Sequence, residues 1–159
     1  MKRDVTRKVL EALDGFEAAM LVTHTQDDDL RARPMALAQH REPERVALAF
    51  VSPKQAPKIS EIQNDAHVNV CLQREGRFIS FSGRVRLVDD ADRLDAVWSD
   101  DLARYLPGGA RREDLTLLEV VPDQGELWDG WGSERLRFLL EDGRAYLVDE
   151  ELAPARSGR

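Results

Sequence analysis

The stretch RVALAFVSPKQAPK, residues 45–58, changes character at its middle. Its first half is almost entirely apolar, which is typical of a strand that is buried on both faces. Two prolines follow in its second half, and proline has no backbone N–H to donate to a sheet. We therefore predict a strand over 45–51, a loop that leaves the sheet at Ser52, and a short helix over 58–65.

Five further strands are expected around this stretch, because other alternating or apolar runs end at clusters of turn residues. They cover residues 19–25, 30–39, 67–72, 77–88 and 115–121. Helical spacing of apolar residues predicts amphipathic helices over 4–18 and 91–106, the second stopped by Pro107-Gly108-Gly109. Since helices do not alternate regularly with these strands, the pattern favours a mainly β fold, an antiparallel barrel with helices at its rims.

The segment 133–148 allows two interpretations. Asp142-Gly143 lies between two apolar runs, which predicts a hairpin with a two-residue turn. A helix over 133–140 is the alternative. The polar tail 153–159 is expected to be frayed. Because the chain shows no internal repeat and no linker, we predict one domain over 1–152.

The charge of the chain is unevenly distributed. The formal net charge is −7, from 23 basic and 30 acidic side chains. Residues 1–80 hold 12 of each sign, so the excess belongs to residues 81–159, with 11 basic and 18 acidic side chains. A negative chain disfavours nonspecific binding to nucleic acid. If an anion is bound, it is therefore expected in the first half, where Lys54 and Lys58 lie close together among only four lysines.

The sequence also bears on the cellular compartment of the protein and on its cysteine chemistry. No apolar run approaches the ~20 residues that cross a bilayer, so no membrane partner is expected. The amino terminus lacks the apolar region and cleavage site of a secretory signal, which favours the cytoplasm. Cys71 is the only cysteine, so an internal disulfide is excluded, and its apolar neighbours predict a buried side chain.

Several motifs that carry chemistry are absent. The chain has no Walker loop, no Gly-x-Gly-x-x-Gly, no Gly-x-Ser-x-Gly elbow and no His-Glu-x-x-His. The three histidines, His24, His40 and His67, are scattered along the sequence. We therefore expect no metal site, and we interpret these histidines as surface or strand-end residues.

Three polar residues in the first half could together bind a phosphate. Arg33 lies on the predicted second strand, Ser52 follows the third, and Lys58 opens the helix after the proline-rich loop. Arginine binds two phosphate oxygens at once, a serine hydroxyl donates to a third, and a lysine at a helix start adds charge. The alternative interpretation is a solvated strand arginine, a turn serine and a surface lysine.

In order along the chain, ten segments resemble the pyridoxamine 5′-phosphate oxidase-like flavin-binding split barrels, most closely their general stress protein subgroup. The resemblance covers about residues 5–130. The segments are Met20–Thr23, Ala32–Met35, Phe50–Ser52, Ala56–Lys58, Glu61–Asp65, His67–Val70, Ile79–Val85, the helix with Trp98 and its Leu106–Gly109 stop, Leu117–Val121, and Glu126–Asp129.

The resemblance implies a six-stranded Greek-key split barrel, a homodimer, and one FMN in each of two clefts between the subunits. Arg33, Ser52 and Lys58 would then bind the FMN phosphate. Backbone groups around three further residues would face the flavin ring: Pro34, Met35 and Val51. Trp128 resembles the tryptophan that reaches the flavin from the partner subunit, and its alternative role is packing within the sheet.

Three departures from the family pattern keep three functions open. Ala56 stands where the subgroup usually has serine, and Phe78 lies about where the oxidases place a flavin-contacting glutamine. The chain after Trp128 also lacks the Arg-x-His substrate motif, so vitamin B6 oxidation is not expected. The hypotheses are an FMN-dependent oxidoreductase of unknown substrate, a non-catalytic flavin protein for storage or stress sensing, and a split-barrel scaffold without cofactor. The sequence leaves FAD, a deazaflavin or haem open as other ligands.

Overall fold

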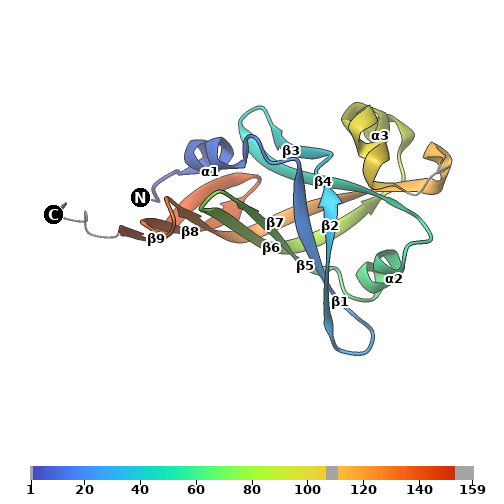
Figure 1. The fold of residues 1–159 in the computed structure, drawn as a ribbon, viewed down its shortest axis with the longest axis horizontal. Coiled ribbons are helices and arrows are strands. Elements are labelled where there is room, and N and C mark those ends of the chain that lie inside the picture. Colours follow the sequence, from blue (N-terminus) through green and yellow to red (C-terminus); the bar gives the residue numbers. More distant parts are fainter. Residues whose placement is uncertain (1, 107–110, 153–159) are drawn as a thin grey trace.

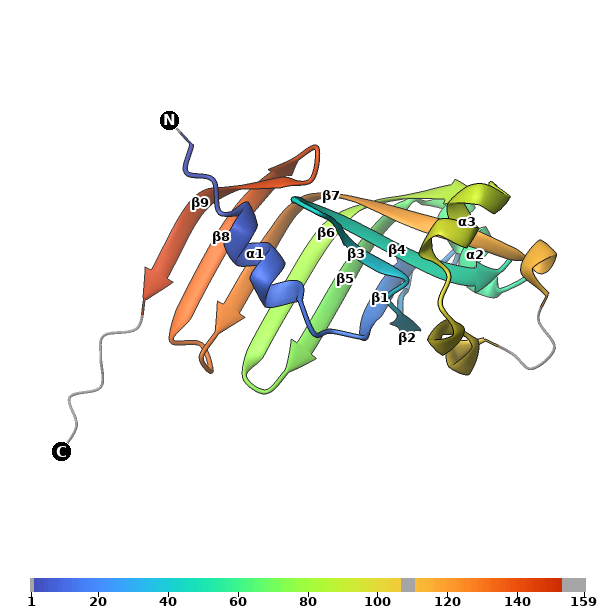
Figure 2. The ribbon, with the colours of Figure 1, turned by 90° about the horizontal axis from the view of Figure 1, so that it is seen from above.

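The computed structural model describes residues 2–106 and 111–152, and its centre is one curled antiparallel sheet (Figures 1 and 2). Seven strands follow one another in the order β2-β1-β5-β6-β7-β4-β3, and β8 pairs with both β7 and β9. The strands are β1 Ala18–His24, β2 Leu30–Ala36, β3 Gln39–Glu42, β4 Arg45–Pro53, β5 His67–Arg74, β6 Arg77–Val88, β7 Leu115–Asp129, β8 Glu134–Glu141 and β9 Arg144–Leu152. The predicted mainly β, antiparallel class is confirmed.

Short helices cover the two ends of this sheet (Figure 1). They are α1 Thr6–Leu13, α2 Pro57–Asn64, α3 Ala91–Val97 and the 3-10 helices η1 Asp100–Tyr105 and η2 Arg112–Asp114. The segment before and within α1 packs against β9, where the Val5 N–H donates to the Ala145 carbonyl at 2.8 Å. At the opposite end, α2 connects β4 to β5, while α3 packs on β7 and η1 on β2.

Two separate apolar clusters stabilise the fold. The larger one fills the inside of the curled sheet, where Phe50, Phe81 and Phe138 are each 0% exposed. Strand alternation sends every second side chain inward, so this cluster follows directly from the apolar pattern. The smaller cluster lies under α3 and η1 and contains Ala36, Ala49, Val51, Leu94, Leu102, Leu115 and Leu117. It fixes these two helices beside the ends of β2 and β4.

The predicted strands and the short helix predicted over 58–65 are found close to their expected positions, the helix as α2. The hairpin interpretation of 133–148 is confirmed as β8 and β9, and the helix over 133–140 is wrong. At the turn, Asp142 has φ 49° and Gly143 has φ 76°, the two positive φ values that a tight hairpin turn requires. A side chain at residue 143 would also meet the Val46 carbonyl oxygen at 2.8 Å, so glycine is needed there for a second reason.

Both predicted long helices are shorter than expected. The helix over 4–18 covers only Thr6–Leu13, because Gly15 turns the chain with φ +94° into β1. The helix over 91–106 is broken at Trp98, whose backbone is extended, and continues as η1. This break lets the Trp98 ring pack on the smaller apolar cluster, with Arg112 4.6 Å from its centre.

The sheet is larger than the six predicted strands. The strand predicted over 30–39 ends at Ala36 as β2, and a separate polar strand, β3, begins at Gln39. Strand β3 was missed because its side chains are hydrophilic. Strand β7 continues eight residues beyond Val121, since Pro122 lies at an irregularity of the β6–β7 pairing where a proline is tolerated. The added length of β7 is what pairs with β8.

Two other predictions need comment. Cys71 is exposed, because the alternation of β5 turns it to the outer face of the sheet, so its predicted burial is wrong. The Pro107-Gly108-Gly109 stop and the tail 153–159 lie outside the described residues. Among the residues that the structure describes, no helix is long and apolar enough to cross a membrane.

Candidate functional site

The fold brings Arg33, Ser52 and Lys58 into one cluster at the end of the sheet that carries α2. Arg33 lies on β2, Ser52 near the end of β4, and Lys58 in the first turn of α2. The Lys58 ammonium donates to the Ser52 hydroxyl oxygen at 3.4 Å. Arg33 is close enough that its charge acts on Lys58. The three residues that were predicted to bind a phosphate are therefore neighbours in space.

Ser52 belongs to the sheet and not to the predicted loop. It pairs with Thr116 of β7, and Pro53 pairs with Leu115, so β4 extends two residues further than expected. The Ser52 side chain is fully buried, and its hydroxyl donates to the Pro53 carbonyl at 3.1 Å. A serine fixed in this way has a defined position, which the turn interpretation would not give it.

Lys58 carries a perturbed ammonium group. Partial burial is the main cause that lowers its pKa below the usual value, and the nearby positive charge of Arg33 lowers the pKa further. Glu61, one turn later on α2, opposes both effects. An anion between Arg33 and Lys58 would relieve this repulsion, so the site favours a negatively charged ligand.

Arg33 keeps two hydrogen-bond donors available. Its Nη1 donates to the Thr23 hydroxyl at 2.7 Å and to the Leu21 carbonyl at 3.3 Å, and its Nη2 donates to Glu61 at 3.0 Å. A guanidinium has five N–H groups, so Nε–H and one Nη2–H remain without an acceptor among the described residues. These two donors lie on one edge of the guanidinium plane, an arrangement that matches two oxygens of a phosphate.

Glu61 also belongs to this cluster, although the sequence analysis gave it no role. Its side chain is only 8% exposed and accepts hydrogen bonds from Thr23 at 2.6 Å, Arg33 at 3.0 Å and Arg31 at 3.3 Å. Burial alone would raise its pKa, but the Thr23 hydrogen bond and the Arg33 charge outweigh burial, so the pKa is lowered. Glu61 is therefore a buried carboxylate. The sequence signal that could have pointed to Glu61 is its position three residues after Lys58, on the same face of the predicted helix.

A small pocket adjoins this cluster and contains most of the other predicted residues. Pro34, Met35, Val51 and Lys58 line it, and the opposite wall consists of Leu102, Tyr105 and Leu106. Its volume is only about 30 Å³, whereas sites for small molecules usually measure about 300–1,000 Å³. The described residues of one chain therefore provide one apolar wall next to the cationic cluster, and they do not enclose a ligand.

Trp128 is the predicted residue that the structure does not bring to the cluster. Ser52 is opposite Thr116, at the start of β7, and Trp128 follows Thr116 by twelve residues on the same strand. At ~3.3 Å per residue, the two positions are about 40 Å apart along the strand. Trp128 instead lies opposite Phe78 and Arg135. Within one chain it cannot reach the pocket.

Ala56 takes the cap position of α2 without a capping side chain. Its methyl group packs against the main apolar cluster, so the substitution of the usual serine adds a small core contact. The donors on Arg33, Ser52 and Lys58 do not depend on this position. The donor set therefore still fits a phosphate monoester, with one hydroxyl fewer.

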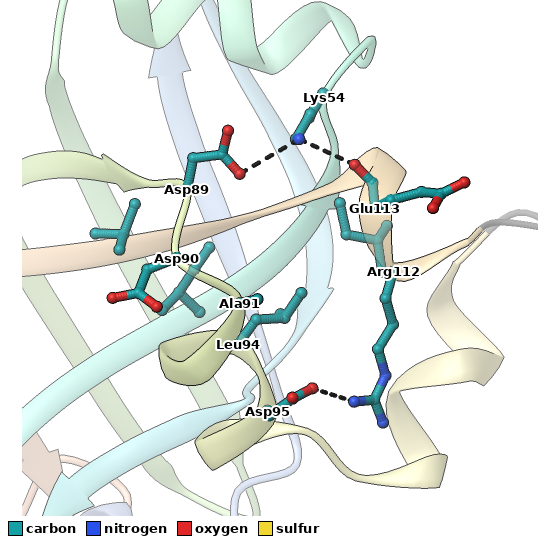
Figure 3. Close-up of a pocket in the computed structure, with 11 residues that line it drawn as sticks. Lys54, Asp89, Asp90, Ala91, Leu94, Asp95, Arg112 and Glu113 are labelled. Atoms are coloured by element: carbon teal, nitrogen blue, oxygen red, sulfur yellow. Dashed lines mark hydrogen bonds and ion pairs between the residues drawn. The ribbon is translucent and has the colours of Figure 1, made fainter.

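A larger pocket of about 340 Å³ lies behind α3, and it contains a second pair of basic residues (Figure 3). Lys54 forms an ion pair with Asp89 at 3.3 Å and donates to the Glu113 carbonyl at 2.9 Å. Arg112 forms an ion pair with Asp95. Each cation thus has its own carboxylate here, and the pocket presents no excess positive charge to an anion.

Comparison with known proteins identifies the family of the chain. The family model for proteins like pyridoxamine 5′-phosphate oxidase matches residues 4–151. General stress protein 26 of Bacillus subtilis is 26% identical over 129 residues, which are 77% of this chain and 86% of that protein.

Solved structures show the same fold. A protein related to general stress protein 26 from Clostridium acetobutylicum has a TM-score of 0.70 at 12% identity, covering 86% of this chain and 94% of that one. A pyridoxamine 5′-phosphate oxidase-related, FMN-binding protein from Nostoc punctiforme has a TM-score of 0.67 at 15% identity, covering 94% and 96%. The expected split barrel is thereby confirmed. The chain belongs to the pyridoxamine 5′-phosphate oxidase-like family, and its relatives place it in the general stress protein 26 subgroup.

Proposed function

We propose that the chain binds FMN and that the bound flavin serves an oxidoreductase reaction. The observation that carries this proposal is the free edge of Arg33 beside Lys58 and the fixed hydroxyl of Ser52. The family includes an FMN-binding relative, and the same cluster adjoins an apolar wall suited to a flat ring. A phosphate and an aromatic ring are the two parts of FMN that such a site recognises.

Each residue has a separate role in this proposal. Arg33 donates two parallel hydrogen bonds to the phosphate, and Lys58 adds a charge. The Ser52 hydroxyl donates to the phosphate after it turns away from the Pro53 carbonyl, which is its acceptor in this structure. The ring then lies along backbone groups of Pro34, Met35 and Val51, which line the adjoining pocket. The phosphate contacts position the ring, and the apolar wall keeps water away from one of its faces.

We also propose that a homodimer completes the site. One chain offers only the small pocket, and Trp128 lies at the far end of β7. Register and alternation place Trp128 on the outer face of the sheet, together with the exposed apolar side chains Met20, Val121 and Leu139. A second copy docked on this face would cover these side chains and bring its own Trp128 to the flavin.

The redox chemistry would come from the cofactor, since flavins carry both hydride and single-electron transfer. Lys58 and Tyr105 are the titratable residues among those that line the pocket. No carboxylate or histidine among these residues is available as a general base. The residues that one chain contributes to this pocket therefore supply binding, orientation and exclusion of water.

The same composition of the pocket supports a second candidate, a flavin-binding protein without turnover. It predicts bound FMN that no nicotinamide donor reduces. The third hypothesis, a scaffold without cofactor, rests on Ala56 and Phe78 and predicts no binding at all. Anaerobic mixing of the loaded protein with NADH and NADPH, followed by the flavin absorbance, separates the first two candidates.

The experiment that tests the proposed function is a titration of purified, flavin-stripped protein with FMN, followed by flavin fluorescence. Saturable binding that Arg33→Ala and Lys58→Ala both weaken supports the phosphate site. Absence of saturable binding by the parent protein rejects the proposal in favour of the scaffold. Light scattering with and without FMN tests the homodimer, and Trp128→Phe tests whether that residue quenches the bound flavin.

A further inference from the structure

We propose that Glu61 is a positioning residue, which together with Thr23 holds the Arg33 guanidinium so that its free edge faces the FMN phosphate. The inference rests on the proposed function, because it assigns a role within the same phosphate site. Glu61 belongs to no motif that the sequence analysis used for chemistry. Its contacts, burial and place on α2 carry the argument.

The contacts of Glu61 fix the orientation of Arg33. One oxygen of Glu61, Oε2, accepts both from Arg33 Nη2 at 3.0 Å and from the Thr23 hydroxyl at 2.6 Å. Thr23 in turn accepts from Arg33 Nη1 at 2.7 Å. The three side chains therefore form a closed triangle of hydrogen bonds. This triangle occupies one side of the guanidinium and leaves Nε–H and one Nη2–H for a ligand.

The triangle is buried, so its geometry is well defined. The side chains of Glu61 and Arg33 are 8% and 17% exposed, and Thr23 is 1% exposed. An arginine side chain without such partners loses conformational entropy when it binds an anion, which weakens binding. A guanidinium that is already held in place avoids most of this loss. Preorganisation of this kind raises affinity without any new contact to the ligand.

Glu61 also connects the two cations of the site. It lies three residues after Lys58 on α2, so the helix that presents Lys58 also anchors Arg33. A carboxylate near a phosphate lowers the attraction for the ligand, which makes Glu61 costly if charge alone determined affinity. Its presence is explained if orientation of Arg33 and reduced repulsion between Arg33 and Lys58 outweigh that loss.

The test compares FMN with riboflavin, which has the same ring but no phosphate. Dissociation constants of both ligands are measured by fluorescence titration for the parent protein, Glu61→Gln, Arg33→Ala and the double variant. Glu61→Gln keeps the size of the side chain and removes its charge. We expect about tenfold weaker FMN binding with unchanged riboflavin binding. In the Arg33→Ala background, Glu61→Gln should cause no further loss, because Glu61 acts through Arg33.

A second pair of variants tests the triangle without changing a charge. Thr23→Val keeps the shape of the side chain but removes the hydroxyl, and we expect a severalfold loss of FMN affinity. Thr23→Ser restores the hydroxyl and should restore the preference for FMN over riboflavin. Thermal unfolding of each variant checks that the fold is retained.

The outcomes separate the explanations. Equal weakening of FMN and riboflavin means that Glu61 supports only the fold, which overturns the proposal. Tighter FMN binding by Glu61→Gln in both backgrounds means that the carboxylate acts only through its charge, and this result also overturns the proposal. If the parent protein shows no preference for FMN over riboflavin, the phosphate site of the proposed function fails as well.

Discussion

Lys54 and Lys58 are four residues apart in sequence, yet they belong to two very different charged clusters. Lys58, Arg33, Ser52 and Glu61 form the first cluster, in which the buried Glu61 carboxylate pairs with Arg33 and the Lys58 ammonium contacts the Ser52 hydroxyl. Lys54 and Arg112 belong to the second, where each cation pairs with a carboxylate of its own (Figure 3).

The two clusters differ in how exposed their charged side chains are and in whether hydrogen-bond donors remain without an acceptor among the described residues. In the second cluster the paired side chains are 38–77% exposed, and exposed pairs of this kind contribute little to stability. In the first cluster, Arg33 and Glu61 are nearly buried, and two donors of Arg33 have no acceptor in the part of the chain that the structure describes. The first cluster therefore combines a nearly buried ion pair with hydrogen-bond donors that a ligand can use. Matched substitutions in the two clusters test this conclusion.

The largest difference is expected in stability. Glu61→Ala leaves the nearly buried Arg33 and Thr23 without their shared acceptor, and we expect a loss of about 3 kcal/mol in the free energy of unfolding. Asp95→Ala removes the partner of Arg112, which is half exposed, and should change stability by less than about 1 kcal/mol. Urea denaturation of the two variants measures both values. Equal losses would show that the two clusters do not differ in this respect.

The next difference concerns the two arginines. Arg33→Ala removes two charge-assisted hydrogen bonds to the phosphate, and we expect FMN affinity to fall about a hundredfold. Arg112→Ala removes an arginine that already has its own carboxylate, and FMN affinity should stay within about twofold. Fluorescence titration of both variants provides the comparison. A large loss for Arg112→Ala would move the ligand site to the pocket behind α3.

The two lysines should differ by a smaller factor. Lys58→Ala removes one charge from the phosphate site, for which we expect about tenfold weaker FMN binding. Lys54→Ala is the matched control, since it removes the same side chain four residues away. We expect no measurable change in FMN affinity for the control. Weakening by both substitutions alike would point to a general effect of charge on an acidic protein.

The smallest predicted effect is a dependence on pH. Because burial and Arg33 lower the pKa of Lys58, the ammonium loses its proton below the usual lysine range. FMN affinity should therefore fall as the pH rises through this lowered pKa. The unliganded protein shows the opposite sign: the unfolded chain binds more protons than the folded one in that window, so stability rises with pH. Lys58→Met should abolish both trends, measured by titration and thermal unfolding between neutral and alkaline pH.

Much of the fold could be predicted because its signals are local. The apolar run of β4, the two-residue turns and the proline at the start of α2 each reflect the preferences of a few adjacent residues. The predictions failed where a distant partner decides the outcome. The helix over 91–106 breaks at Trp98, because that ring packs on the smaller apolar cluster and under Arg112.

The residues of the candidate site also divide into those that the sequence indicates and those that depend on distant partners. Arg33, Ser52 and Lys58 could be found from residue type and from the resemblance to a family, which preserves their order along the chain. Glu61 could not be found in this way, since its partners Arg33 and Thr23 are 28 and 38 residues away. A glutamate on an amphipathic helix normally faces solvent, and only the packing of α2 against β1 turns this one inward.

The sequence alone determined the antiparallel β architecture, the hairpins and the three residues that we propose bind a phosphate. These depend on the alternation of apolar residues, on turn chemistry and on which side chains carry positive charge. The tertiary structure decided which of the two neighbouring lysines has an excess of positive charge around it. It also decided which donors of Arg33 remain available among the described residues, and that Trp128 lies far from the Arg33 cluster within one chain. Such properties depend on contacts between distant segments, and a local pattern does not record which segments meet.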